Sequence, residues 1–71
     1  MEFYLLFRVL LFNNGLPEPL YFKETNITYY KTHSECVENG YKRLDNVMNI
    51  FKELEIEYTN LEFRCLQQKY D

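Results

Sequence analysis

The chain has 71 residues, of which 46% are hydrophobic and 18% aromatic. This length suits a single domain, residues 1–71, and the apolar content excludes an intrinsically disordered chain. Eleven acidic and eight basic residues give a net charge of -3, which does not favour nucleic acid as a partner and is far too small for a protein that imitates DNA.

The first expected element is a strand, EFYLLFRVLLF, over residues 2–12, because the segment is rich in bulky apolar residues and has no Gly or Pro. Its odd positions are all apolar, and its even positions are apolar except for Arg8 and Glu2. A strand that is apolar on both faces is typical of the centre of a sheet. Arg8 interrupts the apolar segment, which is also shorter than a membrane-spanning helix, so we do not expect a membrane span. No cleavage site follows the segment, so we do not expect a secretion signal either. We therefore expect a cytoplasmic protein.

A hairpin should follow. Gly15, Pro17 and Pro19 predict a connecting loop over residues 13–19, and the run LYFKETNITYYKT predicts a returning strand over residues 20–32. The apolar alternation changes parity between Phe22 and Ile27. This change predicts a bulge or a bend around residues 23–26, since one extra residue reverses the face of every later side chain.

From residue 32 onward the period becomes helical. Thr32 and Glu35 have the spacing of a capping box, which predicts a helix start, and Gly40 inside the helix predicts close packing of its backbone against the sheet. The pattern indicates an amphipathic helix of about 20 residues. Its expected inward stripe consists of Val37, Tyr41, Leu44, Val47, Met48, Phe51 and Leu54.

The last expected element is a strand, EYTNLEFRCLQQ, over residues 57–68, with two different faces. Thr59, Leu61, Phe63 and Cys65 form the face that should be buried, and Asn60, Glu62 and Arg64 form the wet face. We expect the last few residues of the chain to fray.

These elements predict an α+β fold of the order β-β-α-β: a three-stranded antiparallel sheet in the order 2-1-3 with one long helix on one face. One helix leaves the other face of the sheet open. A second copy of the chain or a partner protein should cover that face, although the loop 13–19 or the C-terminal tail could fold over it instead. The expected interaction surface consists of Tyr4, Leu6, Arg8, Leu10, Phe12, Asn60, Glu62 and Arg64.

The two cysteines should lie next to each other. Cys36 is in the first turn of the helix and Cys65 is near the end of the last strand, and about 20 helical residues are as long as about ten residues of a strand running back. Two interpretations remain open. Either the pair forms a disulfide across a loop of about 30 residues, or it packs as two buried thiols in a reducing compartment.

The sequence contains no strong catalytic or metal-binding motif. His33 precedes Cys36 by three residues, but one histidine and two cysteines without a CxxC pair predict no metal site. A catalytic Cys–His pair would lack an orienting third group, so we expect neither an enzyme nor a cofactor. Tyr21, Tyr29 and Tyr30 could stack the bases of a single strand, but no basic groove is interleaved with them in the sequence.

Four features together resemble a group of short bacteriophage and bacterial proteins. These are an apolar first strand, the junction of Tyr30, Thr32 and Cys36, the small residue Gly40, and a terminal aromatic-Arg-Cys strand at residues 63–65. The resemblance implies a β-β-α-β fold and a phage origin, and it carries over no catalytic residues.

The hypothesis that follows is a small non-enzymatic protein-interaction module. It would act by binding, as a phage-encoded inhibitor or modulator of a host or defence protein, and it could also pair with itself as a homodimer. The alternatives are a single-stranded nucleic-acid binder that uses exposed tyrosines, or a small homo-oligomeric protein that captures a ligand or depends on a thiol. No membrane partner is expected.

Overall fold

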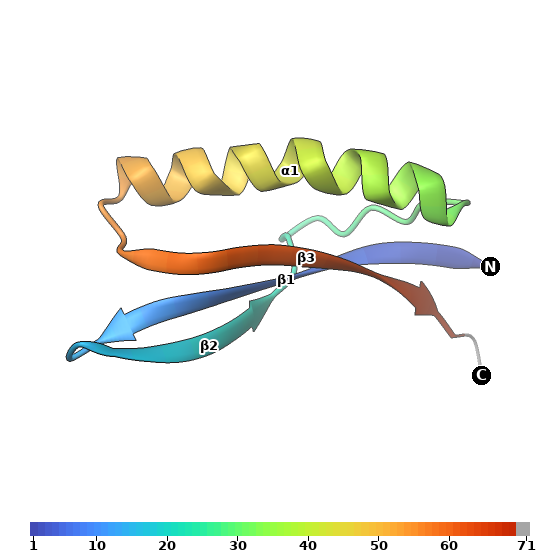
Figure 1. Ribbon diagram of the computed structural model, residues 1–71. Coiled ribbons are helices and arrows are strands. Elements are labelled where there is room, and N and C mark those ends of the chain that lie inside the picture. Colours follow the sequence, from blue (N-terminus) through green and yellow to red (C-terminus); the bar gives the residue numbers. More distant parts are fainter. Residues whose placement is uncertain (70–71) are drawn as a thin grey trace.

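The computed structural model describes residues 1–69, which form three strands and one helix (Figure 1). The elements are β1 (Glu2–Asn13), β2 (Leu16–Phe22), α1 (His33–Glu53) and β3 (Tyr58–Gln68). The sheet is antiparallel in the order β2-β1-β3, and α1 packs on one of its faces. This confirms the predicted β-β-α-β fold. The predicted fraying concerns the chain end, where residues 70 and 71 lie outside the described residues.

The hairpin turn is shorter than predicted. β1 and β2 are joined by Asn14 and Gly15 alone, between the paired residues Asn13 and Leu16. Both turn residues have positive φ, 53° and 81°, which a two-residue hairpin of the Asn-Gly type requires. The predicted loop over residues 13–19 is therefore wrong, because the strand resumes directly after the turn.

The two prolines lie inside β2 and not in a loop. Phe3 and Tyr30 exchange both backbone hydrogen bonds at 2.8 Å, so the odd residues of β1 turn their N–H and C=O groups toward the β2 side. Pro17 and Pro19 stand opposite even residues of β1. Their missing donors therefore point to the open edge of the sheet, where a strand tolerates proline.

The predicted long second strand ends early. β2 stops at Phe22, and residues 23–32 run to the helix as an irregular segment with a bend at residues 25–26 (Figure 1). The parity change between Phe22 and Ile27 thus marks a bend and the end of the strand. Tyr30 returns to form an isolated bridge with Phe3, and only 8% of it is exposed, so it is a core residue and not a surface tyrosine.

Both ends of α1 are capped. Thr32 Oγ1 accepts a hydrogen bond from the backbone N–H of Glu35 at 3.1 Å, as the predicted helix start requires. At the other end, the N–H of Ile56 donates to the carbonyl of Phe51 and the N–H of Glu55 donates to the carbonyl of Lys52. This pattern is a Schellman motif, in which Glu55 occupies the left-handed position with φ 55°. The helix has 21 residues, in agreement with the predicted length.

The helix is rotated relative to the predicted stripe. Its buried residues are Cys36, Gly40 and Val47, whereas three predicted core residues, Tyr41, Met48 and Leu54, are exposed by 64%, 42% and 64%. The rotation has a steric reason. A Cβ atom on Gly40 would lie 2.6 Å from Cδ2 of the Phe63 ring, so no residue larger than glycine fits at this contact without a shift of the ring.

A bulge in β3 reverses the predicted faces at one end of that strand. Arg8 pairs with Glu62, but Leu10 pairs with Thr59, so an extra residue of β3 is accommodated near Asn60, whose φ is 53°. Beyond the bulge Thr59 shares the face of Leu10, away from the helix, and its predicted burial under the helix is wrong. Tyr58 takes that place, and its ring lies 5.1 Å from the ring of Phe51 on α1.

Candidate interaction surface

Alternate residues of β1 have different surroundings. Leu5, Phe7 and Val9 are buried beneath α1, with 7%, 0% and 0% of each residue exposed. The even residues point to the opposite side of the sheet, which we call the helix-free face. No second layer of residues 1–69 covers this face (Figure 1). It consists of Tyr4, Leu6, Arg8, Leu10 and Phe12 from β1, Pro17, Pro19 and Tyr21 from β2, and Thr59, Glu62, Arg64 and Leu66 from β3.

The structure brings together most of the residues predicted for the interaction surface. The five even residues of β1 form one row, with Glu62 opposite Arg8 and Arg64 opposite Leu6. Asn60 is the exception, because it lies at the bulge and has no single partner on β1. The sequence interpretation missed the residues of β2, since it placed the prolines in a loop. The period-2 spacing of Pro17, Pro19 and Tyr21 was the signal that could have found them.

Polar contacts on the helix-free face are few and lie at the surface. Arg8 and Glu62 form an ion pair at 3.5 Å, and the Arg8 guanidinium lies 6.0 Å from the centroid of the Tyr21 ring. At the other end of the face, the Lys23 ammonium lies 4.8 Å from the centroid of the Tyr4 ring. The aromatic rings of this face therefore do lie next to cations, which the sequence interpretation did not expect. Each contact is partly exposed to water and contributes at most about 1 kcal/mol.

The end of the hairpin carries a group of exposed apolar side chains. The hairpin diverges from α1 toward its turn, so neither of its faces is covered there (Figure 1). Phe12 and Tyr21 are exposed by 45% and 58% on the helix-free face, and Leu16 and Leu20 are exposed by 69% and 44% on the other side. Pro17 and Pro19 lie between these residues, and Glu18 is the only charged residue of β2.

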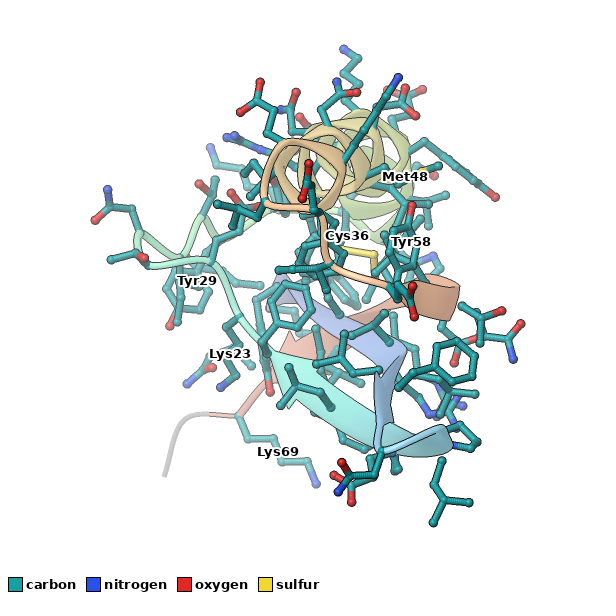
Figure 2. All side chains as sticks on the ribbon, turned by 90° about the vertical axis from the view of Figure 1, so that its left-hand side faces the viewer. Lys23, Tyr29, Cys36, Met48, Tyr58 and Lys69 are labelled. Carbon is teal, nitrogen blue, oxygen red and sulfur yellow. A yellow bond between two sulfur atoms is a disulfide. The ribbon has the colours of Figure 1, made fainter. Side chains whose placement is uncertain are left out.

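Cys36 and Cys65 form a disulfide that joins the first turn of α1 to β3, with a Cα–Cα distance of 6.0 Å and a sequence separation of 29 (Figure 2). Cys36 has no exposed surface. The pair therefore presents no thiolate to a substrate in this structure. The His33 ring packs edge-on against Phe3, with the ring centroids 5.6 Å apart, and the bonded cysteines offer it no thiol proton to accept.

Two grooves flank α1. The groove toward β3 has a volume of about 570 Å³ and is lined by Val37, Tyr41 and Leu44 together with β3, and the groove toward residues 23–28 has a volume of about 500 Å³. Every buried side-chain nitrogen or oxygen in residues 1–69 has a hydrogen-bond partner. In the same residues no cluster of three or more His, Cys, Asp or Glu could hold a metal ion. Within these residues, neither groove therefore contains a buried unpaired polar side chain or a metal-binding cluster.

No family model, curated protein or solved structure matches the chain. Within residues 1–69, no helix combines the length and the apolar character that crossing a bilayer requires.

Proposed function

We propose that this chain is a small protein-interaction module that acts by binding. The observation that carries the proposal is the projecting end of the hairpin, where exposed apolar side chains lie on both faces of two paired strands. An apolar patch with few charges and with aromatic residues is typical of the core of a protein interface. Scattered apolar residues are ordinary on a protein surface, but a contiguous group of them is not.

The partner that fits this surface is a protein with an apolar depression. Phe12 and Tyr21 would be the anchors, because aromatic side chains bury a large area at a low cost in conformational entropy. Two prolines restrict the backbone of β2 before binding, so little additional ordering is needed when the partner arrives. Arg8, beside Tyr21, would lie at the polar rim of the contact.

The resemblance to bacteriophage proteins suggests the class of partner. We propose a host or defence protein whose activity the bound module inhibits or redirects, inside the cytoplasm of the host. This part of the proposal depends on the resemblance, whereas the binding surface depends on the exposed residues of the hairpin.

The test is affinity capture from a bacterial lysate, followed by binding of the purified candidate to the purified chain. The double variant Phe12→Ser with Tyr21→Ser should lose the complex, and we expect at least a 100-fold weaker affinity for two lost aromatic anchors, about 2 kcal/mol each. The matched control is Ile50→Ser with Leu54→Ser, which removes two exposed apolar side chains from the helix end. Equal binding by the hairpin variant, or no specific partner at all, would contradict the proposal.

A second candidate function is the binding of single-stranded nucleic acid. The observation that favours it is that Arg8 and Lys23 lie against the rings of Tyr21 and Tyr4, as in stacking surfaces that also attract phosphates. Fluorescence anisotropy with a labelled oligothymidine at low salt decides this point. An unchanged anisotropy at high micromolar protein eliminates nucleic-acid binding.

A further inference from the structure

The two edges of the sheet are built differently. At the β2 edge, Pro17 and Pro19 remove two backbone donors that another strand would need. The β3 edge has neither Gly nor Pro over its 11 residues. Its only irregularity is the bulge at Asn60, which leaves the part from Leu61 to Gln68 as a regular open edge.

The register identifies the backbone groups that β3 presents outward. Since the odd residues of β1 turn their backbone groups toward β2, the even residues of β1 bond to β3. Leu6 and Arg8 pair with Arg64 and Glu62, so the even residues of β3 turn inward. The N–H and C=O groups of Leu61, Phe63 and Cys65 therefore point to the open edge. None of these residues takes part in the backbone hydrogen bonds formed outside regular elements in residues 1–69.

We propose that β3 pairs antiparallel with β3 of a second copy of this chain, with Phe63 opposite Phe63 of the second copy. In this register Leu61 stands opposite Cys65 of the second copy, so each outward residue of the regular edge meets another outward residue. Each such pair exchanges two hydrogen bonds. The result is one continuous sheet through both copies, related by a two-fold axis at Phe63.

Charge complementarity selects this register. It places Glu62 opposite Arg64 of the second copy, and by symmetry Arg64 opposite Glu62 of the second copy. Shifting the register by two residues in one direction would place Glu62 opposite Glu62, and in the other direction Arg64 opposite Arg64, which are repulsive pairs. Arg8 already lies 3.5 Å from Glu62. The carboxylate of Glu62 would thus lie between two cations, one from each copy.

The exposed side chains of α1 support the same arrangement. Tyr41 is 64% exposed although its ring packs at 5.1 Å against the ring of Phe63, and Met48 is 42% exposed. Figure 2 shows Met48 on the same side of the molecule as Tyr58 of β3, away from Lys23 and Tyr29. Opposite residues in an antiparallel ladder point to the same side, so both helices would lie on one face of the joined sheet. Tyr41, Met48 and the groove beside β3 would then lie at the seam between the copies.

Charge reversal tests the pairing. Glu62→Arg alone places arginine opposite arginine, and Arg64→Glu alone places glutamate opposite glutamate, so each variant should dimerise about 10- to 100-fold more weakly than the wild type. An equimolar mixture of the two variants restores opposite charges at both positions and should form a heterodimer. Light scattering after size exclusion measures the mass, which for a dimer is twice 8.8 kDa. Lys42→Glu, on an exposed position of α1, is the control with the same change in charge as Arg64→Glu.

Amide exchange gives an independent measurement. The N–H of Phe63 should exchange slowly at high protein concentration and fast on dilution, whereas the N–H of Arg64, bonded to β1, should change little. A monomer at every concentration, or single variants that dimerise as the wild type does, would overturn the self-pairing. So would a mixture that stays monomeric while both variants are folded by circular dichroism. Failure here would leave the hairpin proposal intact, because Phe12 and Tyr21 belong to β1 and β2 and do not lie at the open edge of β3.

Discussion

Phe7 and Leu6 are neighbours in the same strand, and they have opposite environments. Phe7 has no exposed surface, stacks on Phe22 at 5.3 Å and lies beneath α1, whereas Leu6 is half-buried on the helix-free face beside Arg64. The two residues have similar apolar character, so the difference comes from what lies above each face. The fold therefore buries mainly one side of β1 and leaves the other side available for contacts with other molecules.

The largest expected effect is on the buried side of β1. Phe7→Ala should lower the free energy of unfolding by about 3 to 5 kcal/mol, because it removes a fully buried ring and leaves a cavity. Leu6→Ala should cost about 1 kcal/mol, since a half-buried side chain loses less apolar area. Chemical denaturation followed by circular dichroism measures both. If Leu6→Ala destabilised the protein as much as Phe7→Ala, the proposed difference between the faces would be wrong.

The next effect concerns the cross-link that holds α1 on the buried face. Replacing both Cys36 and Cys65 with Ser should lower the free energy of unfolding by about 3 kcal/mol, because the disulfide closes a long loop of the unfolded chain. Binding through the hairpin should persist in the fraction that is folded, since Cys65 pairs with Leu5, at the opposite end of β1 from the hairpin turn.

Denaturation with and without a reducing agent measures this contribution. The reductant should destabilise the wild type and leave the double variant unchanged. A wild type that is insensitive to complete reduction would show that the two cysteines stabilise the protein as packed thiols.

The fold could be predicted from the sequence because its signals were local and strong. The apolar run of residues 2–12, the Thr32 cap and the alternation of residues 61–65 fixed the type and order of the elements, and short right-handed connections then left few arrangements. The juxtaposition of Cys36 and Cys65 followed from matching the length of the helix to the length of the strand.

The errors occurred where non-local pairing overrides a local signal. Pro17 and Pro19 indicate a loop by propensity, but the backbone N–H groups that they lack would point to the open edge of the sheet. A strand tolerates proline there, because no hydrogen bond of the sheet is lost. The predicted face of Thr59 was wrong, because the bulge at Asn60 leaves no clear mark in the sequence. Tyr41 and Met48 fit the helical period but not the actual rotation of α1, in which Cys36, Gly40 and Val47 are the buried residues.

The smallest expected effect is on the helix-free face. Arg8→Gln removes the ion pair between Arg8 and Glu62, whose side chains are exposed by 30% and 47%, respectively. Because the pair is partly exposed, this substitution should lower the free energy of unfolding by no more than about 1 kcal/mol. Glu62→Gln should have an equal effect, and the double variant should cost no more than either single one, because both substitutions remove the same pair. The comparison must be made on dilute protein, where Glu62 has no contact with a second copy. A loss of several kcal/mol would mean that this face, and not only the one beneath α1, holds the sheet together.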